Sequence, residues 1–322
     1  MAPITGTRGG PGENQFKRVL TTVLLAVFLV YSLLPIFYLV VSSTKDTTDL
    51  FTSFGLWFAS FNLPENLRDT FAKDDGVYWN WLWNTAYYSV CSAVGAAFIS
   101  TLAGYAFAKY RFPGRIPVFA VILGSIMVPQ TALVIPTYLL LSKIGLIDTP
   151  LAVILPSLVS PFGVYLMRVY AEQSVPDDLL NAARVDGAGE LRIFWSVALR
   201  VLMPGFVTVL LLSFVATWNN YFLPLVVLST PELYPLTIGL ASWNNLAGAG
   251  GGAHSLYPLV ITGALVAVVP IIFAFLFLQR YWQGGLTFGS LKDCIRRIRL
   301  QESRITSGNA RPATTQPQEV RS

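Results

Sequence analysis

Six apolar segments of about 20 residues or more dominate this chain of 322 residues. A helix needs about 20 apolar residues to cross the hydrocarbon core of a membrane. The predicted spans are Val19–Ser43, Leu82–Ala108, Ile116–Val134, Leu151–Val169, Leu202–Leu228 and Leu256–Leu278. Only 12% of the residues are charged, against roughly 25% in soluble domains, and no short alternating segments indicate a barrel. The sequence therefore predicts an all-α polytopic membrane protein with six transmembrane helices.

Local features refine these spans. Pro35, Pro129 and Pro270 are expected to kink or interrupt their helices. The segment between the third and fourth spans, Ile135–Pro150, is partly apolar and is expected to form a short helix near the outer surface. The first span is not predicted to be a cleaved signal peptide, because its apolar core is too long and no small-residue cleavage site follows it.

The basic residues fix the orientation, because cytoplasmic loops carry an excess of Lys and Arg. With the N-terminus inside, 18 of the 22 basic residues face the cytoplasm. The four outside are Lys45, Arg68, Lys73 and Lys143. Both termini are therefore predicted to be cytoplasmic. The net charge of +5 is explained by topology and anionic lipid, with no need for nucleic acid.

The chain is expected to form one membrane domain over residues 18–292. Residues 1–17 are polar and are predicted to be a disordered cytoplasmic N-terminus. Residues 293–322 are predicted to be a basic, disordered cytoplasmic tail. The dense basic cluster at its start, Lys292–Arg299, is interpreted as a membrane-surface anchor, with a specific partner site as the alternative.

The sequence lacks the residues that several kinds of catalytic, metal and nucleotide site require. The single histidine, His254, cannot build a zinc site or a Ser-His pair. The two cysteines, Cys91 and Cys294, are predicted in a span and in the tail, so they cannot pair. No phosphate-binding loop of the Gly-x-x-x-x-Gly-Lys-Ser/Thr type occurs. We therefore predict no enzyme, metal or cofactor site, and no ATP hydrolysis by this chain alone.

The centres of the six spans lack ionisable side chains, which ion-coupled carriers retain inside the membrane. Their polar residues are neutral: Asn84, Thr85, Ser89, Ser92, Ser100, Thr101, Ser125, Gln130, Thr131, Asn219 and Asn220. This pattern suits a neutral polar solute moved by energy supplied from outside the spans. Helix packing is the alternative role for most of these side chains.

A polar island at residues 176–190 separates the fourth and fifth apolar segments. Pro176 is expected to start a short helix there, and two aspartates in the first turn suit the helix dipole. Gly187 is expected to end the helix in the left-handed conformation. Ala182 and Ala183 provide a flat patch for close approach by a partner. The island is interpreted as a rigid lever, with an amphipathic helix resting on the membrane as the alternative.

The same island carries a recognisable signature. It reads Asn181-Ala182-Ala183, three residues, Gly187, nine residues, then Val197-Ala198-Leu199-Arg200. It resembles the cytoplasmic signature of permeases of binding-protein-dependent ABC importers: Glu-Ala-Ala, three residues, Gly, nine residues, Ile-x-Leu-Pro. Asn181 stands in place of the glutamate and Arg200 in place of the proline. The Asp-Gly-Ala at 186–188 looks like the form found in carbohydrate importers.

Further stretches resemble the maltose-permease-like (MalG-type) branch of this family. They are Asn84-Thr85, Gly104–Lys109, Phe112–Arg115, Ile135–Tyr138, Trp218–Leu225 and Gln279–Thr287. Each stretch is weak alone, but the ordered set is specific, and the similarity covers roughly residues 18–292.

The resemblance implies a type I ABC importer permease fold, a multi-pass location in the cytoplasmic membrane of a prokaryote, and a role in sugar uptake. Its implied partners are a second permease subunit in a heterodimer, two cytoplasmic ATPase subunits and an extracytoplasmic sugar-binding protein. It implies a coupling loop over residues 171–200. The residues expected to couple to the ATPase are Asn181, Ala182, Ala183, Asp186, Gly187 and Ala188. Those expected near the ATPase interface are Thr287, Gly289 and Ser290.

The solute path is less defined. Aromatic faces and amides suit sugars, so the candidate path residues are Asn84, Tyr87, Trp218, Asn219 and Asn220. Two alternatives stay open: a permease for another polar solute, such as a glycerol phosphate ester, and an ion-coupled secondary carrier.

Overall fold

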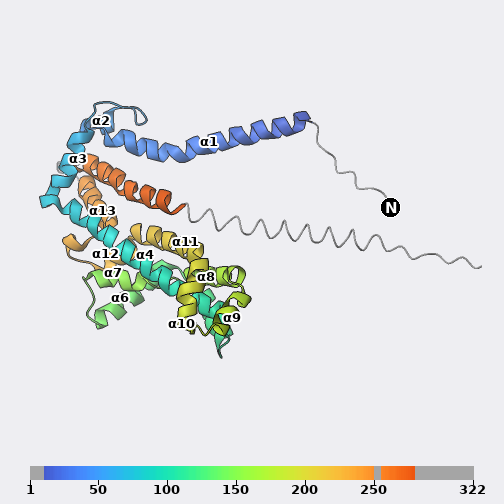
Figure 1. The fold of residues 1–322 in the computed structure, drawn as a ribbon. Helices are drawn as coiled ribbons and strands as arrows, with labels where there is room; N and C mark the ends of the chain where they lie inside the picture. Colours follow the sequence, from blue (N-terminus) through green and yellow to red (C-terminus); the bar gives the residue numbers. More distant parts are fainter. Residues whose placement is uncertain (1–10, 250–254, 280–322) are drawn as a thin grey trace, which may run out of the picture. The chain divides into compact units, whose positions relative to one another are not determined.

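The computed structural model describes residues 11–249 and 255–279, and within them every regular element is helical (Figure 1). The α-helices are α1 (Pro11–Ser43), α2 (Thr47–Thr52), α3 (Leu63–Ala72), α4 (Val77–Lys109), α5 (Arg115–Ile126), α6 (Val134–Lys143), α7 (Pro150–Ser157), α8 (Pro161–Ser174), α9 (Asp177–Val185), α10 (Glu190–Ile193), α11 (Leu199–Trp218), α12 (Phe222–Val227), α13 (Leu236–Gly248) and the helix Leu256–Gln279. Short 3₁₀ turns are η1 (Lys73–Gly76), η2 (Gln130–Leu133) and η4 (Pro231–Leu233), and η3 (Phe194–Ala198) is a π-helical turn.

The predicted all-α membrane architecture is confirmed. Five segments are long and apolar enough to cross a membrane: Lys17–Ser43, Leu63–Lys109, Pro150–Ser174, Glu190–Trp218 and Leu256–Gln279. A sixth crossing is available if the bent pair Arg115–Ile126 and Gln130–Lys143 counts as one span. These six agree with the six apolar segments of the sequence.

The third span differs from the prediction of a continuous helix over Ile116–Val134. The helix α5 ends at Ile126, and the following helical segment is bent from it by 103°. Pro129 lies at the break. Proline interrupts a helix because it lacks a backbone N–H and disfavours helical geometry at the residue before it. The short helix expected in the next segment is α6, which begins at Val134 directly after η2.

Three other boundaries also differ. The helix α1 begins at Pro11, so residues 11–17 are helical where disorder was predicted; proline suits a first helical position because its missing N–H has no partner there anyway. Both α1 and the last helix continue through Pro35 and Pro270. The fifth span ends at Trp218 and not at residue 228, since asparagines follow and compete for backbone hydrogen bonds.

The chain divides into two compact units, which are described separately. The first unit comprises Met1–Tyr88, Val134–Val153 and Trp218–Ile272. The second comprises Ser89–Leu133, Ile154–Thr217 and Phe273–Ser322. The loops predicted outside belong to the first unit, and the loops predicted in the cytoplasm belong to the second.

Aromatic side chains form the core of the first unit. The rings of Trp81 and Trp243 lie 4.8 Å apart, and Tyr78 stacks on Trp243 at 6.3 Å. Gly239 lies against Trp81 so closely that a Cβ there would come within 2.2 Å of the indole. The indole of Trp243 donates to Asp74 at 3.2 Å, which satisfies its polar edge.

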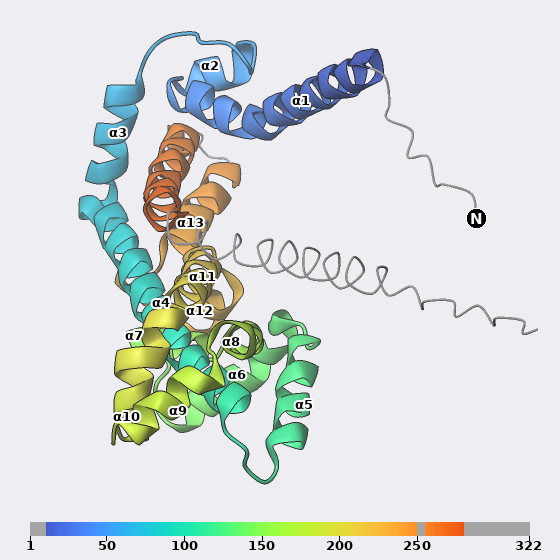
Figure 2. The same cartoon turned by 45° about the vertical axis from the view of Figure 1, so that its right-hand side comes forward.

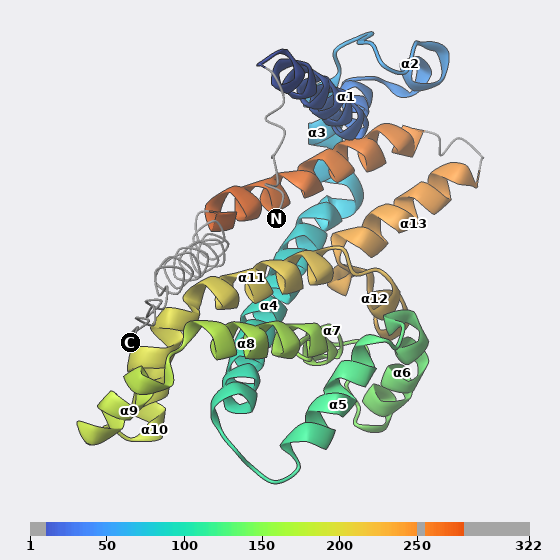
Figure 3. The ribbon, with the colours of Figure 1, turned by 90° about the vertical axis from the view of Figure 1, so that its right-hand side faces the viewer.

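The second unit has a core of small and aliphatic side chains from α4, α8, α9, α10 and α11. Met167, Ala171, Ile193 and Ala198 are fully buried in it. Gly104 of α4 touches α8 directly, since an added Cβ would lie 2.6 Å from the backbone nitrogen of Arg168. Within this unit, α9 and α10 form a small hairpin that follows α8 (Figure 2), and α5 runs beside α8 (Figure 3).

Candidate coupling site and solute-path residues

The polar island folds as predicted into one short helix, α9, closed by a glycine turn. Pro176 precedes its first residue, and Asp177 and Asp178 occupy the first turn. Gly187 has a φ of +79°. The N–H of Gly187 donates to Arg184 O and the N–H of Ala188 donates to Ala183 O, both at 3.0 Å. These two bonds form a Schellman motif, which fixes the direction in which the chain leaves the helix.

One side of α9 is held by the core of the second unit. Leu180 is only 2% exposed. Ala183 and Ala188 pack against the same buried cluster, which includes Met167 and Phe194. A displacement of α9 would therefore act on the side chains of α8 and η3 that pack against it.

A half-buried ion pair ties the start of α9 to the end of α4. The ammonium of Lys109 lies 2.7 Å from Asp177 Oδ1, and the Lys109 side chain is only 7% exposed. The hydrogen bond from Lys109, together with its positive charge, lowers the pKa of the Asp177 carboxyl. Two residues that are distant in sequence thus hold the helix at a fixed place on α4.

A second polar contact closes the other end. Arg184 donates from Nε to Glu190 Oε1 at 2.7 Å and from Nη2 to Glu190 Oε2 at 3.3 Å, and the hydroxyl of Tyr110 donates to the same carboxylate at 2.7 Å. Such a forked pair adds geometric definition as well as energy. Arg184 also donates to Asn181 Oδ1 at 2.9 Å. The asparagine that replaces the signature glutamate is therefore engaged by a neighbour on its own helix.

The opposite side of α9 is open. Ala182, Asp186 and Gly187 are exposed, and Val185 is 88% exposed. A Cβ added to Gly187 would meet nothing within 4 Å in the described part of the chain. Helical spacing places residues 178, 182 and 185 on this one face, opposite Leu180. The small side chains on this exposed face leave room for a partner to approach closely, although a single exposed apolar side chain is by itself ordinary.

The second half of the signature lies at a junction of helices. Val197 and Ala198 belong to the π-helical turn η3, while Leu199 begins α11. Arg200, in place of the signature proline, is exposed in the first turn of α11. The helix runs on through Pro204.

The candidate path residues all belong to the first unit, and several of them have structural partners. The amide of Asn84 donates to Glu232 O at 2.7 Å and to Tyr234 O at 3.3 Å. Tyr87 is partly exposed beside Tyr88, while Trp218 is buried. Asn219 is exposed, and the backbone oxygen of Asn220 accepts from Thr237 at 2.7 Å.

Some predicted residues lie outside the described part of the chain. These are Thr287, Gly289, Ser290 and the basic cluster Lys292–Arg299.

Sequence reasoning missed the polar contacts that hold α9. Lys109, Tyr110 and Glu190 are essential to them, yet Lys109 and Asp177 are separated by 68 residues. Of these contacts, only the Arg184–Glu190 pair could be suspected from the sequence, because its two opposite charges lie on either side of the glycine turn.

Comparison with known proteins decides the family. Residues 96–286 match the family described as "Binding-protein-dependent transport system inner membrane component". The chain belongs to this family. It is therefore a multi-pass permease of the bacterial inner membrane, and ATP hydrolysis belongs to other subunits of such a transporter. A binding protein and an ATPase are the partners that this family requires.

Individual relatives resemble the permease over nearly its whole length. It is 33% identical to the "Arabinooligosaccharides transport system permease protein AraQ" of Bacillus subtilis, over 88% of this chain and 99% of the relative. It is 31% identical to the "Maltodextrin transport system permease protein MdxG" of the same species, over 87% and 96% of the two chains. A chain in the crystal structure of a bacterial ABC transporter that imports the acidic polysaccharide alginate matches with a TM-score of 0.72 and 25% identity, over 86% of this permease and all of that chain.

Proposed function

We propose that this chain is the permease subunit of a carbohydrate importer and moves a mono- or oligosaccharide into the cell. The observation that carries the proposal is the end-to-end similarity to permeases whose names specify sugars, at up to 33% identity. The absence of charged residues at the span centres in the sequence agrees with a neutral solute and an external energy source.

The energy enters through α9. In this proposal its open face, which carries Ala182, Val185, Asp186 and Gly187, lies against an ATPase subunit, with Asn181 at its edge. Ala183 and Ala188 connect that face to the core of the second unit. Closure of the ATPases moves α9, and the rigid Schellman turn together with the ion pair to Lys109 transmits the movement to α4 and α8. Residues 287, 289 and 290 would add a second ATPase contact, as the resemblance implies.

The solute path is proposed to include Tyr87 and Asn219, whose side chains are accessible, with Asn84, Trp218 and Asn220 shaping the wall behind them. An exposed tyrosine ring can stack on a sugar, and an amide can bind its hydroxyl groups. The hydrogen bonds of Asn84 to the 232–234 backbone support a shaping role for this residue.

A second permease subunit is proposed to complete the transporter as a heterodimer. The most apolar window of α1 is 0% buried within the described part of the chain, so its contacts are with lipid or another subunit. The sugar is proposed to arrive from an extracytoplasmic binding protein.

Uptake of radiolabelled sugars by cells that contain the complete transporter tests this proposal. Ala182→Arg places a long charged side chain on the flat face of α9, and should lower ATP-dependent uptake at least tenfold while the permease stays in the membrane. Ala182→Ser keeps a small side chain and serves as the matched control, with uptake near wild type. Normal uptake in Ala182→Arg would contradict the coupling role of α9.

The solute is tested separately. The purified binding protein that delivers solute to this permease should bind an oligosaccharide or monosaccharide, and unlabelled sugar should compete in uptake. Competition by a glycerol phosphate ester in place of any sugar would overturn the carbohydrate assignment. Uptake that persists when the ATPase subunits are absent would instead indicate a secondary carrier.

A further inference from the structure

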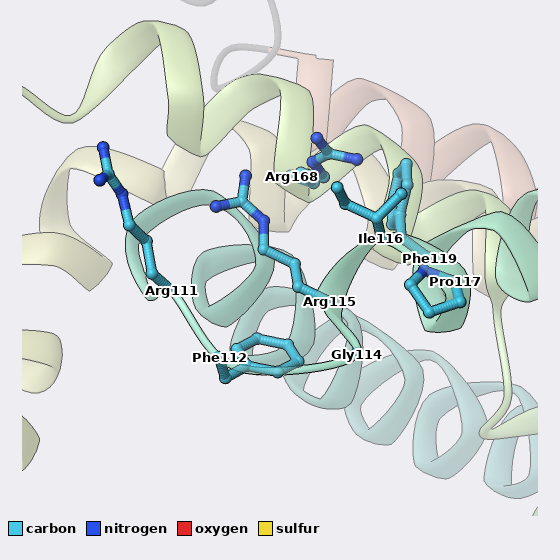
Figure 4. Close-up of a pocket in the computed structure, with 8 residues that line it drawn as sticks. All are labelled: Arg111, Phe112, Gly114, Arg115, Ile116, Pro117, Phe119 and Arg168. Carbon is cyan, nitrogen blue, oxygen red and sulfur yellow. The ribbon is translucent and has the colours of Figure 1, made fainter.

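A pocket of about 540 Å³ in the second unit is lined by three arginines (Figure 4). Arg111 lies in the loop between α4 and α5, Arg115 is the first residue of α5, and Arg168 belongs to α8. Their guanidinium groups extend to the same side of the loop. None of the described residues that line the pocket is acidic. Several guanidinium groups in one pocket suit a phosphate group, which they bind through paired N–H donors.

Arg168 is the least expected of the three. It lies within the span Pro150–Ser174, toward the end that the sequence predicts to be cytoplasmic, and charged side chains inside spans are rare and often functional. Its guanidinium carbon sits 3.8 Å from the centre of the Phe119 ring. Its Nε is buried and has no hydrogen-bond partner in the described part of the chain. Arg168 is thus oriented by an aromatic face and still holds an unused donor.

Within the described part of the chain, the other two arginines have few hydrogen-bond partners. The contact of Arg115 to Tyr110 O is long, at 3.4 Å. Asp177 is an acid near Arg111, and it already accepts from Lys109 at 2.7 Å. Positive charge is therefore in excess around the pocket.

An apolar wall continues from the charged end. Ile116 is 82% exposed and lines the pocket with Phe112 and Pro117. Farther along α5, Leu123 is also exposed, and its spacing of seven residues from Ile116 places it on the same face of the helix. The positive-inside orientation places the start of α5 at the cytoplasmic face, so this wall would lie against the acyl chains of the inner leaflet. A cationic end beside an apolar wall matches a phospholipid better than a free anion.

We propose that this pocket binds the headgroup phosphate of an anionic phospholipid of the inner leaflet. Arg115 and Arg168 hold the phosphate, Arg111 adds charge at the rim, and the acyl chains follow the exposed face of α5. The inner leaflet is rich in anionic lipid, and basic pockets between spans on this side suit such headgroups. The site does not depend on which solute the permease transports.

Native mass spectrometry of the full-length permease in detergent tests the proposal. The protein is titrated with dioleoylphosphatidylglycerol and, separately, with dioleoylphosphatidylcholine. The wild type should bind the anionic lipid at least about tenfold more tightly, since each arginine near the surface contributes measurably to the attraction. Arg111→Gln combined with Arg115→Gln should remove this preference and leave the Arg168–Phe119 contact in place. Arg168→Lys, which keeps the charge but loses the planar fork, should reduce the preference only partly.

The matched control carries the same change of charge elsewhere. Arg192→Gln combined with Arg200→Gln alters two exposed arginines of the second unit outside the pocket, and should leave the preference intact. Equal binding of the two lipids by the wild type, or an equal loss in this control, would overturn the proposal. Release of the bound phosphatidylglycerol by millimolar inorganic phosphate would show a free-anion site and would also overturn it. None of these results depends on sugar uptake, so the two proposals can fail separately.

Discussion

The two units use their polar side chains in opposite ways. In the first unit, four α4 side chains at helical spacing bind one short segment of backbone, residues 231–236. Trp81 donates to Pro231 O at 2.8 Å, Asn84 to Glu232 O at 2.7 Å and Tyr88 to Leu233 O at 2.9 Å, while Thr85 Oγ1 accepts from the N–H of Leu236 at 2.7 Å. In the second unit, polar side chains hold one helix by its ends, and the signature face of that helix stays open.

This difference separates structural motifs from functional ones. The Asn84-Thr85 pair resembles a family motif, and the structure accounts for it fully by the connection that it fixes. Ala182 and Gly187 belong to a motif of equal strength, yet nothing in the described part of the chain packs against their exposed side. A motif that satisfies no internal contact is the better candidate for a partner surface.

The largest effect is expected from the close contact between α4 and α8. Gly104→Ala places a Cβ 2.6 Å from the backbone of α8, where no flexible side chain can move away. We expect a loss of roughly 1–3 kcal/mol of stability from overpacking, visible as an earlier thermal unfolding in detergent-based size-exclusion chromatography. Gly124→Ala is the matched control, because its Cβ meets nothing within 4 Å among the described residues and alanine favours helix by about 0.5–1 kcal/mol. Equal behaviour of the two variants would refute the close contact.

Two lysine–aspartate pairs of the same length test the contrast between the units. Both Lys109–Asp177 and Lys73–Asp74 measure 2.7 Å, but the Lys109 side chain is 7% exposed and that of Lys73 is 38% exposed. Lys109→Met should lower sugar uptake several-fold, because α9 loses its tie to α4. Lys73→Met should leave uptake unchanged and shift stability by less than about 0.5 kcal/mol. Similar uptake in both variants would show that the Lys109 pair carries no coupling.

The clamp at Asp148 in the first unit predicts a pH dependence. Its carboxylate accepts from Thr230 Oγ1 at 2.6 Å and from the N–H groups of Ser229 and Thr230 at 2.8 and 3.0 Å. These bonds, that of the Thr230 hydroxyl most of all, lower the pKa of Asp148. A lowered folded pKa gives a stabilisation that is present above the unfolded value near 4 and is lost as the pH falls through the lower folded value.

Asp148→Asn should therefore cost about 1 kcal/mol at neutral pH, an amount discounted for the exposure of the site. Asparagine also tolerates the φ of +60° at this position, so backbone strain stays constant. Thermal unfolding of both proteins from pH 7 to pH 3 should show a difference that is constant near neutral pH and shrinks as the pH falls below about 4. A difference that grows as the pH falls would contradict the assignment.

The smallest effect is expected from one hydroxyl of the first unit. Tyr88→Phe removes the bond to Leu233 O and should cost about 0.5–1.5 kcal/mol. Because the other α4 contacts to residues 231–236 remain, uptake should stay near wild type. A loss of uptake comparable with that of Lys109→Met would mean that this connection takes part in coupling.

The sequence predicted what depends on local chemistry. Apolar length located the six spans, and Gly187 predicted the end of α9 because only a glycine enters the left-handed conformation without strain. It could not predict contacts between distant segments. The hydrogen bonds of Asn84 to residues 232 and 234, and the pair of Lys109 with Asp177, arise only when the helices pack. The sequence predicted a kink or interruption at Pro129 but not the bend of 103°, because a proline indicates where a helix is interrupted and not by what angle.

The most direct test of the account is photocrosslinking from position 185 in the intact transporter. A photoreactive amino acid in place of Val185, which is 88% exposed on the open face of α9, should form an adduct with the ATPase subunit. The same amino acid in place of Leu180, which is 2% exposed, should form none. An adduct between position 185 and the extracytoplasmic binding protein, or no ATPase adduct in an actively transporting complex, would contradict the claim that ATP-driven motion enters through α9.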